Sequence, residues 1–221
     1  MFSNHKKQKY MQRMMKWPLL VAMIITVGSC AKDPLKNMSE DESRIYITNR
    51  DSTINFSNYK TYSIADSVLV IDNGNVVGRQ ANAWDAQMIS ALKSAMAARG
   101  YVQVDRSQNP DLGINASRVF NTSTNVVDLS NYWSSYGSYY DPYYWGYGGY
   151  DYYYPPVYGY YQSTEAAFSI DLLDLKNASS AQTIKVIWNG LIRGEGIFNT
   201  NNVQSQVKVL FDQSPYLKAN Q

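Results

Sequence analysis

The sequence predicts an α+β fold: a two-layer sandwich in which a mainly antiparallel sheet carries two amphipathic helices on one face and a long aromatic hairpin loop. Three patterns lead to this expectation. Two segments have apolar residues at helical spacing, several others alternate apolar and polar residues as strands do, and an aromatic stretch interrupts the run of strands. Each helix has one apolar stripe to bury, so both are expected on the same sheet face.

The clearer helix is predicted over residues 82–99, where Asn82 can cap the first turn and Gly100 can end the last one. Its apolar residues recur every four positions: Trp84, Met88, Leu92 and Met96. A second helix is predicted over residues 200–213, before Pro215. Its apolar stripe consists of Val203, Val207, Leu210 and Phe211.

Strands are expected on both sides of the first helix. Residues 44–64 contain two β-rich segments, and residues 67–79 read as a hairpin with Asn73-Gly74 as its turn. Three later strands are expected to place one set of residues each on a single face: Leu112, Ile114 and Ala116; then Ala166, Phe168, Ile170 and Leu172; then Ile184, Val186, Trp188 and Ile192.

The N-terminus is typical of a bacterial lipoprotein signal. Five basic residues and no acidic one precede Trp17–Val27, an apolar run of 11 residues. A spanning helix needs about 20 apolar residues, so this run fits the core of a secretory signal. It ends in Gly28-Ser29-Cys30, which resembles a lipobox, and we expect lipid attachment at Cys30. The chain then divides into a signal peptide (1–29), a flexible tether (30–43) and a single α+β domain (44–221).

Removal of the signal changes the charge of the protein. It takes five of the 20 Lys and Arg residues and leaves 15 against 18 Asp and Glu, so the net charge changes from +2 to −3. A mildly acidic chain is a poor match for nucleic acid, which is bound largely through Lys and Arg. Two or three acyl chains would anchor the protein durably. Ala31 follows Cys30 where some inner-membrane lipoproteins have Asp, so we expect the outer membrane, facing either the periplasm or the cell surface.

Several short motifs follow one another along the chain: Phe56-Ser-Asn-Tyr59-Lys-Thr61-Tyr62, Gly100-Tyr101, Pro110-Asp111-Leu112, Ile170-Asp171-Leu172 and Trp188-Asn189-Gly190. Their order resembles that of one family, the domain-of-unknown-function 4136 family of bacterial lipoproteins. The resemblance covers most of residues 45–216. It implies a fold and a cell-envelope location, but no activity and no catalytic residues.

The mature chain lacks histidine and free cysteine, two side chains that are common in enzyme active sites. The only histidine of the sequence, His5, lies in the signal, and the only cysteine is the expected lipid site. Ser-His-Asp chemistry and Cys/His zinc sites are therefore excluded, and we predict no catalytic residue, metal or cofactor. The alternative is a carboxylate-dependent hydrolase of cell-wall glycan that uses Glu165, Asp171 or Glu195. Asp171 and Asp174 should point to opposite faces of one strand, and we expect these acids to be solvated.

The aromatic insert, residues 130–163, is the candidate partner-binding loop. Residues 132–161 hold 14 of the 20 tyrosines and no Lys or Arg. The named candidates are Trp133, Tyr139, Tyr140, Tyr143, Tyr144, Trp145, Tyr152, Tyr153 and Tyr154. Three interpretations remain open: a loop that the fold tolerates, a contact with an envelope protein or glycan, and insertion among lipid headgroups. We expect the insert to lie outside the core and to be dispensable for folding.

Overall fold

The computed structural model of the chain describes residues 39–73, 75–120, 127–128, 142–153, 160–161 and 166–220. The signal, Cys30 and most of the tether lie outside these residues. Among them, no helix has the length and apolarity needed to cross a bilayer. The helices are α3 (Glu40–Ser43), α4 (Ala83–Ala98), α6 (Ala178–Ala181) and α7 (Val203–Asp212), with 3-10 turns η2 (Phe56–Asn58), η3 (Arg106–Gln108) and η5 (Thr200–Asn202). The strands are β1 (Ile45–Arg50), β2 (Thr61–Ile64), β3 (Val68–Asp72), β4 (Asn75–Gln80), β5 (Val102–Gln103), β6 (Leu112–Phe120), β7 (Val127–Asp128), β8 (Asp151–Tyr153), β9 (Tyr160–Tyr161), β10 (Ala167–Asp174) and β11 (Thr183–Arg193).

The main sheet is mixed and has the order β1-β11-β10-β6-β2-β5. In addition, β3 pairs with β6, and β8 pairs with β11. The long strands β6, β10 and β11 and the edge strand β1 pair antiparallel. In contrast, β2 and β3 pair parallel with β6. The parallel pairs arise because α4 lies between β4 and β5 in the chain, and a crossover helix returns the chain in the same direction. The sequence-based expectation of antiparallel pairing missed these parallel pairs.

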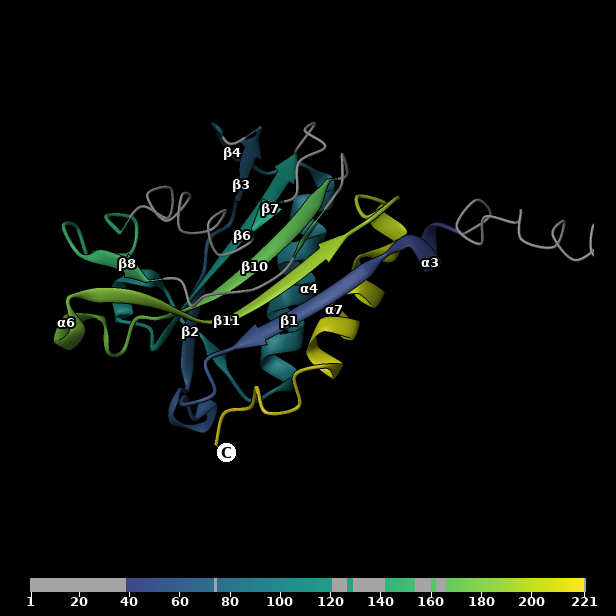
Figure 1. The fold of residues 1–221 in the computed structure, drawn as a ribbon. Coiled ribbons are helices and arrows are strands. Elements are labelled where there is room, and N and C mark those ends of the chain that lie inside the picture. The colour runs from purple at the N-terminus through teal and green to yellow at the C-terminus, as the bar shows by residue number, and fades with distance from the viewer. Residues whose placement is uncertain are drawn as a thin grey trace, which may run out of the picture. The chain divides into compact units, whose positions relative to one another are not determined.

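The helices α4 and α7 lie on the same side of this sheet (Figure 1). Both apolar stripes are buried as predicted, and they form one core with the strands. This core includes Trp84, Met88, Leu92, Met96, Val203, Val207, Leu210 and Phe211 from the helices and Leu112, Ile114, Phe168, Ile170, Leu172, Trp188 and Ile192 from the sheet. The open, sandwich-like α+β arrangement of the sequence analysis is thus present.

The first turn of α4 is closed by a reciprocal pair of hydrogen bonds. The Asp85 amide donates to Asn82 Oδ1 at 2.9 Å, and the Asn82 amide donates to Asp85 Oδ2 at 2.9 Å. This capping box satisfies two amides that the start of a helix leaves without partners. At the other end, Gly100 has a φ of +85°, which closes the helix in the left-handed region as predicted.

A buried ion pair attaches the start of α4 to the sheet. Arg118, on β6, places its Nε 3.1 Å from Asp85 Oδ1 and donates from Nη2 to Asp85 Oδ2 at 3.2 Å. The same Nη2 donates to Gln80 Oε1 at 2.7 Å. The Asp85 side chain is 0% exposed and that of Arg118 is 11% exposed. The strand, the helix and the end of β4 are therefore held together by one guanidinium group.

The predicted hairpin at residues 67–79 is confirmed. Strands β3 and β4 pair antiparallel, and Asn73 adopts the left-handed conformation with a φ of +44°. Gly74, its partner in the predicted turn, lies outside the described residues. The outer strand β4 is exposed at every residue except Gly78, which is half-buried.

One sequence-based assignment of strand faces is wrong. Along β10 and β11 the register passes from Leu172 opposite Trp188 to Leu173 opposite Val186, so Ile187 is an extra residue in β11. Such a β-bulge reverses the alternation of side chains. Ile184 and Val186 consequently lie on the face opposite to Trp188, where they join a second apolar cluster.

Candidate binding site

Part of the aromatic insert folds against the sheet face that is opposite to α4 and α7. Residues 142–150 form consecutive tight turns, in which the amides of Trp145 and Tyr147 both donate to the Pro142 carbonyl, at 3.1 and 2.8 Å. The chain then enters β8, which pairs parallel with the start of β11. The insert connects β6 with β10, but most of it lies outside the described residues.

Trp145 fixes this segment to the sheet. Its side chain is only 5% exposed and packs in the second apolar cluster, with Leu173, Leu175, Ala178, Ile184 and Val186. The indole lies against Gly113 of β6, where an added Cβ would come within 3.1 Å of the indole ring and of Leu175 Cδ1. Gly113 therefore leaves the space that the ring occupies. The expectation that the insert lies outside the core is wrong for Trp145. The reason is that removing a large aromatic ring from water lowers the free energy of the folded state.

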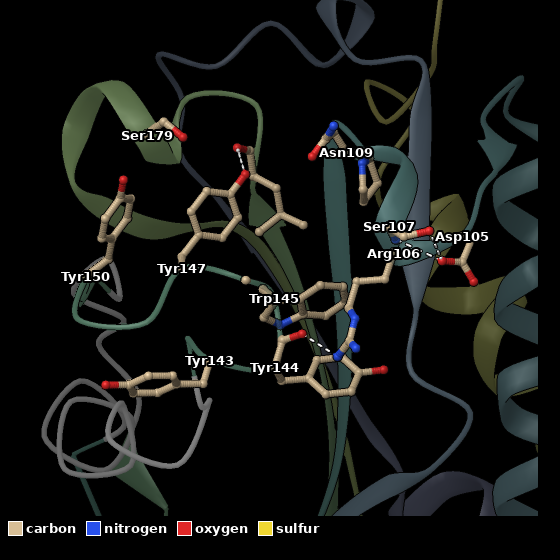
Figure 2. Close-up of a pocket in the computed structure, with 13 residues that line it drawn as sticks. Asp105, Arg106, Ser107, Asn109, Tyr143, Tyr144, Trp145, Tyr147, Tyr150 and Ser179 are labelled. Carbon is tan, nitrogen blue, oxygen red and sulfur yellow. Dashed lines mark hydrogen bonds between the residues drawn. The ribbon is translucent and has the colours of Figure 1, made fainter.

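The turns of the insert and η3 together enclose a pocket with a volume of about 540 Å³. Its residues come from three places along the chain: Asp105, Arg106, Ser107, Asn109 and Pro110; Tyr143, Tyr144, Trp145, Gly146, Tyr147 and Tyr150; Leu175 and Ser179. Figure 2 shows Tyr147 and Tyr150 on one side of Trp145 and the η3 residues on the other. The volume falls in the range of about 300–1,000 Å³ that is usual for small-molecule sites.

Tyr147 and Tyr150 form an aromatic pair in the pocket. Their ring centroids are 5.4 Å apart with an interplanar angle of 43°. The Tyr147 hydroxyl donates to the Leu175 carbonyl at 3.0 Å, which holds its ring in place. Burial is the main cause that raises the pKa of Tyr147, with a hydrogen bond from Ser179 acting in the opposite sense. The hydroxyl therefore stays protonated at neutral pH.

The polar side of the pocket is a short, capped turn. Asp105 Oδ1 accepts from the Ser107 amide at 2.8 Å and from its hydroxyl at 2.6 Å. These two hydrogen bonds lower the pKa of the exposed Asp105 carboxyl. The turn ends at Asn109, which adopts the left-handed conformation with a φ of +52° directly before Pro110. Asn tolerates this region better than most residues, and here it exposes an amide side chain at the rim.

The arginines beside the pocket are engaged with Tyr144. Arg106 donates from Nη1 to the Tyr144 carbonyl, and its Cζ lies 4.4 Å from the centroid of the Tyr144 ring. Arg79, from β4, has its Cζ 4.6 Å from that centroid. Both guanidinium groups thus make cation–π contacts with one tyrosine.

Next to the Trp145 cluster lies a row of buried polar side chains. Asn189 Nδ2 donates to Ser169 Oγ at 2.9 Å and to Asp171 Oδ1 at 2.5 Å. Asp171 is 0% exposed. Burial and, secondly, the nearby Asp171 carboxylate raise the pKa of Tyr152 well above its ordinary value. Tyr152 remains a neutral phenol, and Asp171 is shielded from any polymer outside.

The candidate residues from the sequence have different positions. Tyr143 is 75% exposed and Tyr153 is 47% exposed. Tyr144 and Tyr152 are partly buried against the Trp145 cluster. Trp133, Tyr139, Tyr140 and Tyr154 lie outside the described residues. Sequence reasoning missed the other half of the pocket, η3, although the spacing of Asp105 and Gln108 is that of a capping box.

Of the carboxylates of the hydrolase alternative, the structure describes Asp171 and Glu195, which differ in burial. Asp171 and Asp174 point to opposite faces of β10 as expected, but both are buried, so the expectation of solvated acids is wrong for them. The cause is that Asp174 is hydrogen-bonded to Asn177, at 2.8 Å from Nδ2, and Asp171 to Asn189. Glu195 is exposed after the end of β11, and Glu165 lies outside the described residues.

Fold and site together define a sandwich-like α+β domain with an aromatic pocket at one end of the sheet. The chain belongs to the family described as Domain of unknown function (DUF4136), whose model matches residues 47–216. The chain is similar to the crystal structure of a DUF4136 family protein from Bacteroides thetaiotaomicron, with 27% sequence identity and a TM-score of 0.65. The match covers 80% of this chain and 99% of the Bacteroides chain. A PelC dodecamer structure from Paraburkholderia phytofirmans is 10% identical, with a TM-score of 0.40 and the same coverage. No curated protein matches this sequence.

The motifs that resemble the family stabilise the fold. Phe56, Tyr59 and Tyr62 are buried. Asp111 Oδ2 accepts from the Lys60 amide at 2.7 Å, which ties the starts of β2 and β6 together. A Cβ on Gly190 would lie 2.6 Å from the Trp188 ring, so the glycine leaves the space that this ring occupies. The family residues therefore explain the architecture, whereas six of the 13 residues that line the pocket come from the insert.

Proposed function

We propose that this chain is a lipid-anchored protein of the bacterial outer membrane with a non-enzymatic binding or assembly role. One observation carries the binding role: Trp145 packs part of the insert on the sheet, and the turns around it form an aromatic pocket whose lining includes the exposed Tyr143. The anchor is supported by the basic start of the chain, its short apolar run and Cys30. The absence of histidine and of a second cysteine from the mature sequence supports a role without catalysis.

The anchor is tested by Cys30→Ser. The variant should incorporate no labelled fatty acid and should accumulate as a precursor that retains its signal, because the thiol is the acceptor of the lipid. Metabolic labelling and mass spectrometry of the N-terminus measure both outcomes. A Cys30→Ser chain that is still acylated and processed would refute the lipid site.

The binding role is tested by photo-crosslinking in cells. A photoreactive phenylalanine analogue replaces Tyr143, which lines the pocket and is exposed, in the full chain. We expect a discrete adduct with one envelope component, detected by a mobility shift and identified by mass spectrometry. Tyrosine at this position offers a large contact area with few rotamers, which suits a binding surface.

The matched control places the same analogue at Ala97, which is exposed on α4, on the other side of the sheet. Ala97 should give no discrete adduct. Equal labelling from the two positions, or none from position 143, would contradict a binding role for the pocket.

A further inference from the structure

We propose that the pocket formed by η3 and residues 142–150 binds the pyranose rings of a neutral oligosaccharide. This inference rests on the proposed binding function and specifies its ligand class. Six residues carry it: Asp105, Asn109, Tyr143, Tyr147, Tyr150 and Ser179.

The tyrosine pair forms a stacking platform. An aromatic cage for a cation holds the cation over ring faces, within about 6 Å of each centroid. Tyr147 and Tyr150 instead contact each other, with centroids 5.4 Å apart, so no ammonium group fits between them. Both residues line the pocket, and the exposed part of each ring is an electron-rich face. The C–H groups on one side of a pyranose ring are weakly positive and apolar, and they complement such a face.

The platform is held in place before any ligand arrives. The hydrogen bond from Tyr147 to the Leu175 carbonyl fixes one ring. The buried Trp145 fixes the turn that carries it. The ring of Tyr143 lies over Gly148, where an added Cβ would be 2.3 Å from Tyr143 Cε1. A preorganised site loses less side-chain entropy on binding, so a ligand with few strong contacts gains most from it.

The polar groups of the pocket match hydroxyl groups. The side-chain amide of Asn109 offers two donors and an acceptor oxygen, and the hydroxyl of Ser179, which donates to Tyr147, can accept from a ligand. Both residues are exposed at the rim. A sugar hydroxyl both donates and accepts, so it can pair with either group.

The charges favour a neutral ligand over an anion. Phosphate and carboxylate are bound by bidentate guanidinium groups, but Arg106 directs its guanidinium to the carbonyl and ring of Tyr144. The hydrogen bonds from Ser107 lower the pKa of Asp105, which keeps this carboxyl ionised at neutral pH. An anionic sugar would therefore meet a negative charge and have to displace Arg106.

The experiment measures binding of named oligosaccharides to the full chain purified in detergent, by calorimetry and saturation-transfer NMR. The neutral probes are the β-1,4-linked tetramers of N-acetylglucosamine and of glucose. The tetramer of glucosamine is the cationic probe, and the tetramer of galacturonate is the anionic one. We expect at least one neutral tetramer to bind and the anionic one to bind at least about tenfold more weakly. The cationic one should bind no more tightly than the neutral ones, because Arg106 also lines the pocket and offsets the charge of Asp105.

Variants locate the site. Tyr150→Ala should weaken binding of the neutral tetramer about tenfold, which corresponds to the loss of one stacking ring. Tyr150→Phe keeps the ring, and its affinity for the neutral tetramer should be within about threefold of the wild-type affinity. Tyr153→Ala removes an exposed tyrosine of β8 that does not line the pocket and should leave binding unchanged. Thermal unfolding of each variant establishes that it is folded.

Three results would overturn the ligand class: no neutral tetramer binds, a charged tetramer binds more tightly, or Tyr150→Ala and Tyr153→Ala behave alike. A discrete protein adduct from position 143 combined with no sugar binding would refute the oligosaccharide and retain the proposed binding function. Loss of both signals would refute both.

Discussion

Trp145→Ala should lower the free energy of unfolding by about 3–5 kcal/mol, the usual cost of truncating a buried tryptophan. The ring is 5% exposed and packs with Leu173, Leu175 and Ile184. In a domain of this size the loss corresponds to a fall in Tm of roughly 6–20 °C. Calorimetry or circular dichroism of the full chain in detergent measures it.

The control is Tyr143→Ala, two residues away and 75% exposed. It should change the free energy of unfolding by no more than about 0.5 kcal/mol. Gly113→Ala tests the same contact from the sheet side, where its Cβ would crowd the indole at 3.1 Å. We expect a loss of about 1–3 kcal/mol, typical of overpacking. If Trp145→Ala melted like the original chain, the insert would be the dispensable outer loop that the sequence alone suggested.

The helical core was predictable because its signals are local. Trp84, Met88, Leu92 and Met96 repeat with the period of a helix, and Asn82 stands where a cap is needed. The role of each of these residues can be inferred from the residues close to it in the sequence. The same holds for Val203, Val207 and Leu210 in α7, so both helices and their common sheet face followed from the sequence.

The reversal of faces in β11 was not predictable from alternation. Ile184, Val186 and Trp188 have the spacing of one strand face, and nothing in the sequence marks Ile187 as the extra residue. A bulge is set by the partner strand and by the volumes that must fit on each side. Here it brings Ile184 and Val186 beneath Trp145, on the face that carries the pocket.

Only part of the pocket could be predicted from the sequence, because its assembly also depends on contacts between distant segments. Tyr143 and Tyr144 were candidates because the insert is rich in tyrosine, but periodicity does not separate the buried Trp145 from its neighbours. Its seat depends on Gly113, which is far away in the sequence. Asp105 and Asn109 reach the pocket only through the pairing of β5 with β2 and of β2 with β6. Such long-range placements have no signature in a single segment.

Arg118→Met should be as damaging as loss of Trp145, although it removes a charge and not a ring. It leaves the Asp85 carboxylate, which is 0% exposed, without its cation. Breaking one partner out of a buried ion pair costs about 3–5 kcal/mol, because the remaining charge is uncompensated. Chemical denaturation of the full chain in detergent measures the change in the free energy of unfolding.

The double variant Arg118→Met/Asp85→Asn separates the ion pair from packing. Asparagine keeps an oxygen that can accept from the Asn82 amide, so the capping box survives while the buried charge is gone. We expect the double variant to be more stable than Arg118→Met alone. Lys208→Met is the control, since Lys208 and Asp212 form an exposed pair with side chains 73% and 58% exposed, worth no more than about 0.5 kcal/mol. If the double variant were no more stable than Arg118→Met, the cost would come from packing of the arginine stem, and the buried charge would not be what ties α4 to the sheet.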